Sequence, residues 1–323
     1  ADLTFVVRNQ GAQDVGRLYG ILEADRASPF FEEEIVVGVV PAGGEATGHL
    51  RFTLPPRLHT GSERFTFALR QDGRRDPVAT AEVILDVREA PRPHLSLRYG
   101  PGAGASAITP GGTLPLVLTV LNDGEGESAP LSVSVFKDND GDLSLGEGVF
   151  RLDGIPAGGQ SELVVPLTLK AGSEARIGGL ANIQVHIEER FDDEVDARYR
   201  ATLFHKLALP IGQDLVEGRI DQPRLRVADI RQEGDTATIG VTVSGTDLRY
   251  VSALLDREKV DYRPAASLAD GIYRVDLALK PGLNSVRILA SGADDITDVL
   301  PLRLWGPAAV AGGDQATAEA RPK

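Results

Sequence analysis

One acidic loop carries the residue types that bind a hard metal ion. Residues 137–147 read KDNDGDLSLGE, so Asp138, Asp140 and Asp142 stand at alternate positions. Three carboxylates at this spacing can point into one loop, and carboxylate oxygens are the ligands that calcium prefers. Calcium is therefore the one cofactor that the sequence brings into consideration.

The loop departs from an EF-hand loop in two places. Counted from Asp138, its glycine, Gly141, comes two places early, and Val149 stands where a bidentate glutamate is needed. Glu147 comes two residues before that position. Two interpretations remain open: a calcium site made by Asp138, Asp140, Asp142 and Glu147, and a solvated acidic loop.

Hydrolytic chemistry has no recognisable residue set in this chain. Such a site needs a nucleophile beside a positioned base. The histidines are scattered and have no recognisable spacing to an acidic partner: His49, His59, His94, His186 and His205. Of these, His186 and His205 stand in two runs that we expect to pair, which could bring their rings together. The sequence has no G-x-S-x-G, H-E-x-x-H or P-loop motif, so we expect no catalytic residue.

Four aromatic residues are candidates for a binding surface. Phe30 and Phe31 are apolar residues in an acidic stretch, and Tyr250 and Tyr262 lie in the last third of the chain. Trp305 ends the last expected strand, where we expect it to close a core. The expected partner is a protein or peptide, added as a strand to an exposed sheet edge.

Composition excludes several classes of function. The net charge of −13 opposes the Lys/Arg surface that binding nucleic acid requires. No apolar run approaches the roughly 18 residues of a membrane span, and no signal segment starts the chain. Cysteine is absent, which excludes disulfides and thiolate chemistry. Methionine is absent even at position 1, which we interpret as a processed chain or a fragment.

A long stretch of the sequence occurs twice. Residues 3–44 and 116–159 each contain an alternating apolar run, an Asn-x-Gly turn, a second run, an acidic loop and a Pro-Ala-Gly-Gly turn. The turns begin at Asn9 and Asn122, which are 113 positions apart (122 − 9). A repeat longer than roughly 100 residues is a duplicated domain. At the turns, Asn and Gly are expected to supply positive φ.

Alternating runs fill most of the chain and predict strands throughout. We expect an all-β protein of three tandem antiparallel β-sandwiches of Ig-like or CARDB-like type, with two linkers at 89–94 and 210–223. The second copy begins with an extra run at 94–99, so the opening strand of the first sandwich is expected upstream of residue 1. The expected units are 1–90, 91–211 and 218–306, followed by a disordered tail at 307–323.

The first copy resembles a known family. Residues 8–44, with the turn at Asn9–Gly11, the loop Asp25–Phe31 and the turn Pro41–Gly44, are similar to the region downstream of the catalytic domain in tail-specific (carboxyl-terminal processing) serine peptidases of myxobacterial type. The second copy and the third domain resemble the next parts of those proteins. None of the family's catalytic positions falls on this chain.

The resemblance implies an exported bacterial protein, periplasmic, envelope-bound or secreted, with PDZ and Ser/Lys catalytic domains N-terminal to residue 1. The chain itself is then expected to be a non-catalytic spacer, substrate-presenting or protein-interaction region whose partners include that upstream peptidase domain. The alternative is a surface adhesin or filament subunit built from the same modules. Hydrolysis by this chain itself is the third hypothesis.

Overall fold

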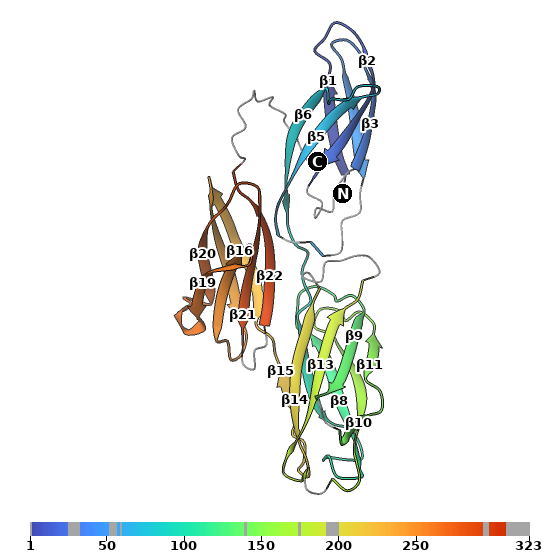
Figure 1. Ribbon diagram of the computed structural model, residues 1–323, viewed down its shortest axis with the longest axis vertical. Helices are drawn as coiled ribbons and strands as arrows, with labels where there is room; N and C mark the ends of the chain where they lie inside the picture. The colour runs from blue at the N-terminus through green and yellow to red at the C-terminus, as the bar shows by residue number, and fades with distance from the viewer. Residues whose placement is uncertain are drawn as a thin grey trace.

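Strands make up nearly all of the regular structure. The computed structural model describes residues 2–24, 33–51, 57–58, 60–138, 141–173, 176–191, 200–292 and 297–307, and no α-helix lies among them. The strands form three β-sandwiches, each with its own buried apolar cluster. The first and second lie end to end, and the third lies beside their junction (Figure 1). The expectation of an all-β chain of tandem antiparallel sandwiches is confirmed.

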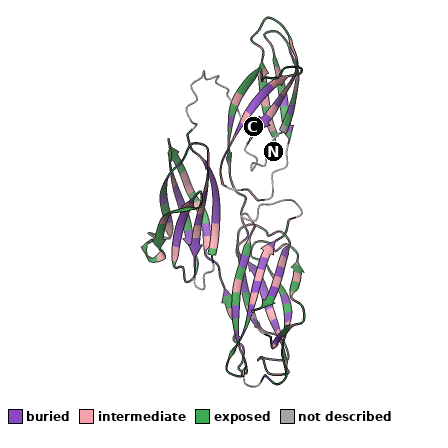
Figure 2. Cartoon of the chain, viewed as in Figure 1, coloured by how far each residue is buried: buried purple, intermediate pink, exposed green. Residues whose placement is uncertain are grey.

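The second sandwich has two complete sheets. One has the strand order β10-β12-β8-β7-β15 and the other β11-β9-β13-β14. Apolar residues at alternate positions turn one face of each strand to the space between the sheets (Figure 2). The strands are β7 (Leu95–Pro101), β8 (Thr113–Asn122), β9 (Leu131–Lys137), β10 (Leu143–Leu145), β11 (Val149–Leu152), β12 (Gln160–Leu169), β13 (Leu180–Glu189), β14 (Thr202–Pro210) and β15 (Gly218–Ile220).

The expected linker at 210–223 is wrong. Its residues 218–220 form β15, an edge strand paired antiparallel with β7. Leu215 and Ile220 are buried in the core of the second sandwich. The stretch has no period-two pattern because only isolated apolar residues reach the core. The second sandwich therefore extends past 211, and residue 218 does not begin the third.

The first sandwich repeats the second with fewer strands. β1 (Asp2–Arg8) pairs with β4 (Glu45–Arg51), as β8 pairs with β12 in the second copy. The facing sheet has the order β3-β2-β5-β6. Within the described residues, no strand takes the place of β7 beside β1. Its other strands are β2 (Val15–Glu23), β3 (Glu33–Val40), β5 (Thr60–Gln71) and β6 (Ala79–Val87).

The third sandwich is joined to the first by strand pairing. Its outermost strand, β22, pairs in parallel with β5 through Leu302 opposite Thr60 and Arg303 opposite Gly61. The two sheets thereby become one continuous sheet. The strands are β16 (Arg224–Glu233), β17 (Thr236–Ser244), β18 (Tyr250–Leu255), β19 (Glu258–Pro264), β20 (Ile272–Ala278), β21 (Leu283–Ser291) and β22 (Thr297–Trp305). The expected tail at 307–323 lies outside the described residues from position 308 onward.

The Asn-x-Gly turns work through the asparagine side chain. None of Asn9, Gly11, Asn122 and Gly124 has positive φ, so the expected conformational role is wrong. Asn122 is fully buried at the end of β8. Its amide group meets four main-chain groups, so it ties three separate loops together: it donates to Gly126 O and Ile155 O and accepts from the N–H of His94 and of Gly124.

Candidate functional site

The acidic loop of the second sandwich contains an ion pair. Asp138 Oδ2 lies 3.2 Å from Lys206 Nζ, so an ammonium group already faces one of the proposed ligands. Among the described residues, no three His, Asp or Glu side chains are grouped to hold a metal. Asp140 lies outside them, and Asp142 and Glu147 are described without forming such a group. Calcium binding stays a prediction.

The structure brings two of the four candidate aromatics together. The Tyr250 and Tyr262 ring centroids are 5.1 Å apart on the β18–β19 hairpin, and Lys259 Nζ lies 5.1 Å from the centroid of Tyr262. Tyr262 is half exposed on the edge strand β19. Phe30 and Phe31 lie outside the described residues. The hairpin therefore offers an exposed aromatic contact, and its use as an interface stays a prediction.

The two histidines of β13 and β14 do not meet. His186 is opposite Phe204, and His205 is opposite Val185. Successive residues of a strand point to opposite faces, so the two rings lie on different sides of the sheet. His186 instead makes an edge contact with Phe204, at a centroid distance of 6.3 Å. The expected approach of these two rings is wrong.

A cavity of about 460 Å³ lies where the three sandwiches meet. We call it the junction cavity. Its walls come from all three units: Arg57 and Thr60 from the first, Glu189 and residues 200–202 from the second, and residues 297–300 from the third. Residues 89–95, 222 and 224–227, together with Glu125 and Arg287, complete the lining. Acidic and basic side chains both line the cavity, and the pairs that they form determine which charges remain available to a ligand.

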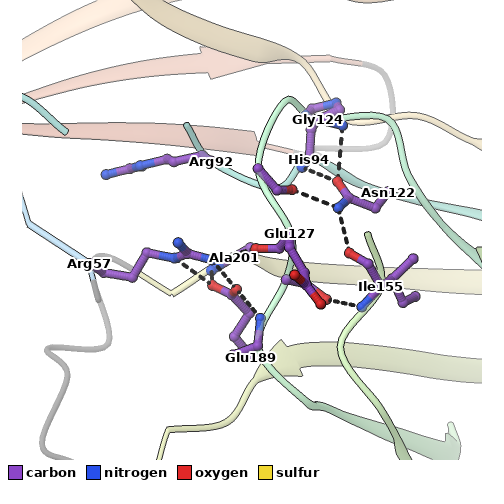
Figure 3. Close-up of polar contacts among 12 residues, drawn as sticks. Arg57, Arg92, His94, Asn122, Gly124, Glu127, Ile155, Glu189 and Ala201 are labelled. Atoms are coloured by element: carbon purple, nitrogen blue, oxygen red, sulfur yellow. Dashed lines mark hydrogen bonds and ion pairs between the residues drawn. The ribbon is translucent and has the colours of Figure 1, made fainter. Parts of the chain in front are cut away.

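Two residues that line the junction cavity, Arg57 and Glu189, form a buried ion pair (Figure 3). Arg57 Nη2 lies 2.5 Å from Glu189 Oε1, and Arg57 Nε lies 3.3 Å from Oε2. Glu189 has no exposed side-chain surface, and Arg57 has 9%. The carboxylate also accepts the N–H groups of Ala129 and Ala201, at 2.9 and 2.8 Å. Glu189 thus ties two loops of the second sandwich to the first.

A second buried pair joins the first sandwich to the third. Glu63 Oε1 lies 3.4 Å from Arg303 Nε, and their side chains are 0% and 10% exposed. Arg64 stacks over the ring of Trp305 at 5.5 Å from its centroid. Trp305 therefore contacts the first sandwich at the end of β22, where the sequence had led us to expect it to close a core.

These charged residues carried a signal in the sequence. Glu189 follows Ile183, Val185 and Ile187 at period two, which places a carboxylate on the core-facing side of β13. Glu63 stands in the same phase as the buried Phe65 and Phe67 of β5. A carboxylate in a core phase needs a partner. Which arginine supplies it could not be read from the sequence.

His94 and Asp298 are two further titratable groups of the junction cavity, and both are half-buried. His94 Nε2 lies 3.2 Å from Gln222 O, so this nitrogen carries the proton. Asp298 accepts the N–H groups of Leu225 and Val299, at 2.8 and 2.9 Å. Burial lowers the pKa of His94, and it raises the pKa of Asp298. The His94 imidazole is bonded to a main-chain carbonyl, whereas activation of a nucleophile requires a bond to a hydroxyl or thiol. This contact therefore orients the ring and activates no nucleophile.

The stability of the junction should depend on the protonation of His94. Because the pKa of His94 is lowered in the folded state, the unfolded chain takes up the proton at a higher pH than the folded chain does. The stability that neutral His94 contributes above pH 6.5 is therefore lost as the pH falls below that value. Asp298 opposes this trend, since its raised pKa favours the protonated form in the fold. We therefore expect the difference in free energy of unfolding between wild type and His94→Gln to become smaller as the pH is lowered from about 7.5 to 5.5. Urea titrations at each pH measure it, and a constant difference would contradict the assignment.

Comparisons with known proteins assign no family. No protein-family model matches the chain, and no curated protein matches it. Among solved structures, the fibronectin(III)-like modules of CbhA from Clostridium thermocellum are similar at 10% identity, with a TM-score of 0.25, over 68% of this chain and 100% of that one.

Two further solved structures are similar over most of the chain. A bacterial ice-binding adhesin matches at 13% identity and a TM-score of 0.26, over 95% of this chain and 91% of that one. A protocadherin gammaB7 fragment matches at 12% identity and a TM-score of 0.22, over 94% and 69%. Identities and scores this low assign neither a ligand nor a partner. Within the described residues, no helix is long and apolar enough to cross a membrane.

Proposed function

We propose that this chain is a non-catalytic, protein-binding accessory region of an exported serine peptidase, in which three Ig-like modules form a spacer or substrate-presenting arm. The observation that carries the proposal is the set of direct links between modules. The strand pair β5–β22 and the ion pairs Glu63–Arg303 and Arg57–Glu189 connect the first module to both others.

These links matter because modules in one chain move relative to each other by default. A buried ion pair left with one partner is costly, so each pair opposes separation of the modules that it joins. Main-chain pairing between β5 and β22 adds a link that has no rotamer freedom. An arm that holds its modules in one arrangement can present a bound protein at a set distance from an upstream domain. The likeness of residues 8–44 to the peptidase family supports the choice of that domain.

Two measurements test the proposal. The reading frame upstream of residue 1 should encode PDZ and Ser/Lys catalytic domains. In that protein, deleting this region should leave kcat/KM for a short unstructured peptide unchanged and lower it roughly ten-fold for a folded protein substrate, since only the latter needs presentation. Equal activities on the folded substrate would contradict the proposal. Self-association of the purified chain in light scattering would favour the adhesin or filament alternative.

The fixed arrangement can be tested in the chain itself. A Cβ added at Gly61 would meet the carbonyl oxygen of Arg303 at 2.1 Å, so Gly61→Ala must force β5 and β22 apart. We expect a larger radius of gyration in small-angle scattering, with all three cores intact by circular dichroism. The matched control is Gly16→Ala, whose added Cβ meets Val39 at 3.7 Å, an ordinary contact. An unchanged radius in Gly61→Ala would show that the strand pair does not hold the modules.

A further inference from the structure

Strand β1 forms an unpaired sheet edge in the described part of the first sandwich. Asn9 N–H donates to Gly44 O at 2.9 Å, continuing the β1–β4 ladder. Successive residues of a strand direct their main-chain groups to opposite sides. The N–H and C=O groups of Thr4, Val6 and Arg8 therefore point away from β4. No described strand pairs with them.

The core beneath this edge is incompletely covered. The inward residues of β1, Leu3, Phe5 and Val7, are only half-buried. Their counterparts in β8 of the second sandwich are Leu116, Leu118 and Val120, and all three are 0% exposed. The two sets have the same place in the repeat, and the sheets differ in the strand that lies beside them. In the second sandwich that neighbour is β7.

The turn asparagines record the same difference. Asn9 and Asn122 make matching bonds: each donates to the residue before the Pro-Ala-Gly-Gly turn and accepts the N–H of the glycine two residues after the asparagine. Asn122 Oδ1 also accepts the N–H of His94, at 3.1 Å, directly before β7. Asn9 Oδ1 has no such second donor among the described contacts.

The glycines of the two turns agree with this. A Cβ added at Gly124 would lie 2.4 Å from His94 N, and one at Gly126 would lie 1.9 Å from Pro91 O, so both positions are kept clear for the incoming segment. At Gly11, the counterpart of Gly124, the nearest contact is Asn9 itself, at 3.2 Å. The turn of the first sandwich therefore keeps a glycine, Gly11, at the position that Gly124 keeps clear, although no described segment packs against it.

The second sandwich shows what fills such an edge and where it comes from. β7 runs antiparallel to β8, with Leu95 opposite Asn122 and Leu97 opposite Val120. These two leucines are 1% and 0% exposed. β7 comes from the stretch of chain that leads into β8. We propose that the open edge of β1 binds one extended strand from polypeptide on the N-terminal side of Asp2, antiparallel to β1, with apolar side chains opposite Asn9 and Val7.

The consequence is that the first sandwich is completed by the polypeptide that precedes it. The added strand buries the inward face of β1, satisfies its outward main-chain groups and gives Asn9 Oδ1 a second donor. The module and the upstream polypeptide are then joined by a shared sheet. The inference is independent of the peptidase assignment. The proposal also predicts a sequence pattern. In β7, Leu95 and Leu97 stand 21 and 19 residues before Leu116 (116 − 95 and 116 − 97). Apolar residues are therefore expected at about these distances before Leu3.

Hydrogen exchange on three chains tests the proposal. One is the chain of residues 1–323, and the second carries a copy of residues 92–113, which includes β7 and its connection, directly before Ala1. The third carries the same copy with Ser in place of both leucines. We expect the N–H groups of Thr4, Val6 and Arg8 to exchange roughly ten-fold or more slowly in the second chain than in the other two. Equal exchange in all three would overturn the proposal.

A variant on β1 separates strand addition from general stabilisation. Proline is tolerated on an edge strand where its missing N–H would face solvent. Val6→Pro should therefore keep the fold by circular dichroism and lose the protection of Thr4 and Arg8 in the fused chain, whereas Val6→Thr should retain it. Protection retained in a folded Val6→Pro variant would overturn strand addition at this edge.

Two further outcomes distinguish the other occupants. If the three N–H groups already exchange slowly in residues 1–323 and light scattering shows a dimer, a second copy fills the edge and the proposal is wrong. If a free peptide of residues 92–101 protects them and the fused copy does not, the edge belongs to a separate polypeptide, which overturns the proposed source.

Discussion

Replacing Glu189 with alanine should destabilise the second sandwich by about 3–5 kcal/mol. The carboxylate is fully buried and accepts the N–H groups of Ala129 and Ala201 as well as the guanidinium of Arg57. Its removal leaves the largely buried Arg57 without the carboxylate that balances its charge, although Arg57 still donates to Glu127 O, and it leaves two main-chain N–H groups without this acceptor. Urea unfolding followed by circular dichroism measures the loss.

The neighbouring Glu188→Ala variant is the matched control. Glu188 stands on the outward face of β13, partly exposed, so its loss should cost less than about 0.5 kcal/mol. Arg57→Ala should cost less than Glu189→Ala, since the carboxylate keeps its two N–H donors. Equal losses in the two glutamate variants would show that burial of Glu189 does not set the cost.

Replacing Asn122 with alanine should destabilise the second sandwich by about 3 kcal/mol, and Asn9→Ala should destabilise the first by about 1 kcal/mol. Asn122 is fully buried and bonded to four main-chain groups. Its removal would leave the N–H groups of His94 and Gly124 without this acceptor and Gly126 O without this donor, while Ile155 O keeps the N–H of Ser128. Asn9 is only half-buried, so water can replace its partners.

Asn9→Ala and Asn122→Ala serve as controls for each other, because the same substitution is made at the same place in the two copies of the repeat. Denaturant unfolding with a probe in each sandwich gives both values. Comparable losses would mean that burial of the asparagine does not matter. If a strand is added to β1, the cost of Asn9→Ala should rise toward that of Asn122→Ala, since Asn9 Oδ1 then has a second donor to satisfy.

Local patterns in the sequence were sufficient for the fold class. Period-two runs show directly which residues face the buried side of a sheet, so the strands from Leu95 to Pro210 fall close to the runs in the sequence, except for the three-residue β10, which lies in the stretch interpreted as an acidic loop. β15 was missed because a three-residue edge strand has too few positions to show a period. The Asn-x-Gly turns were located, but their mechanism was misjudged, since side-chain bonds to distant loops leave no local trace.

The candidate site was foreseen less well. Tyr250 and Tyr262 were selected as exposed aromatics and do lie together, because a hairpin brings residues on adjacent strands into contact. The junction residues were not selected. Arg57 and Glu189 are 132 positions apart, and Glu63 and Arg303 are 240 apart (303 − 63), so only the packing of whole modules brings them together.

The sequence by itself determined that this protein is a series of β-sandwiches with one duplicated module, because strand phase and turn residues are encoded within a few positions. The tertiary structure decided how the modules are joined, and it showed that β1 has an open edge where β8 is covered by β7. Contacts between modules depend on partners far apart in the chain. An unpaired edge is recognised only by comparing the neighbours of two equivalent strands, which the amino-acid pattern of either strand does not contain.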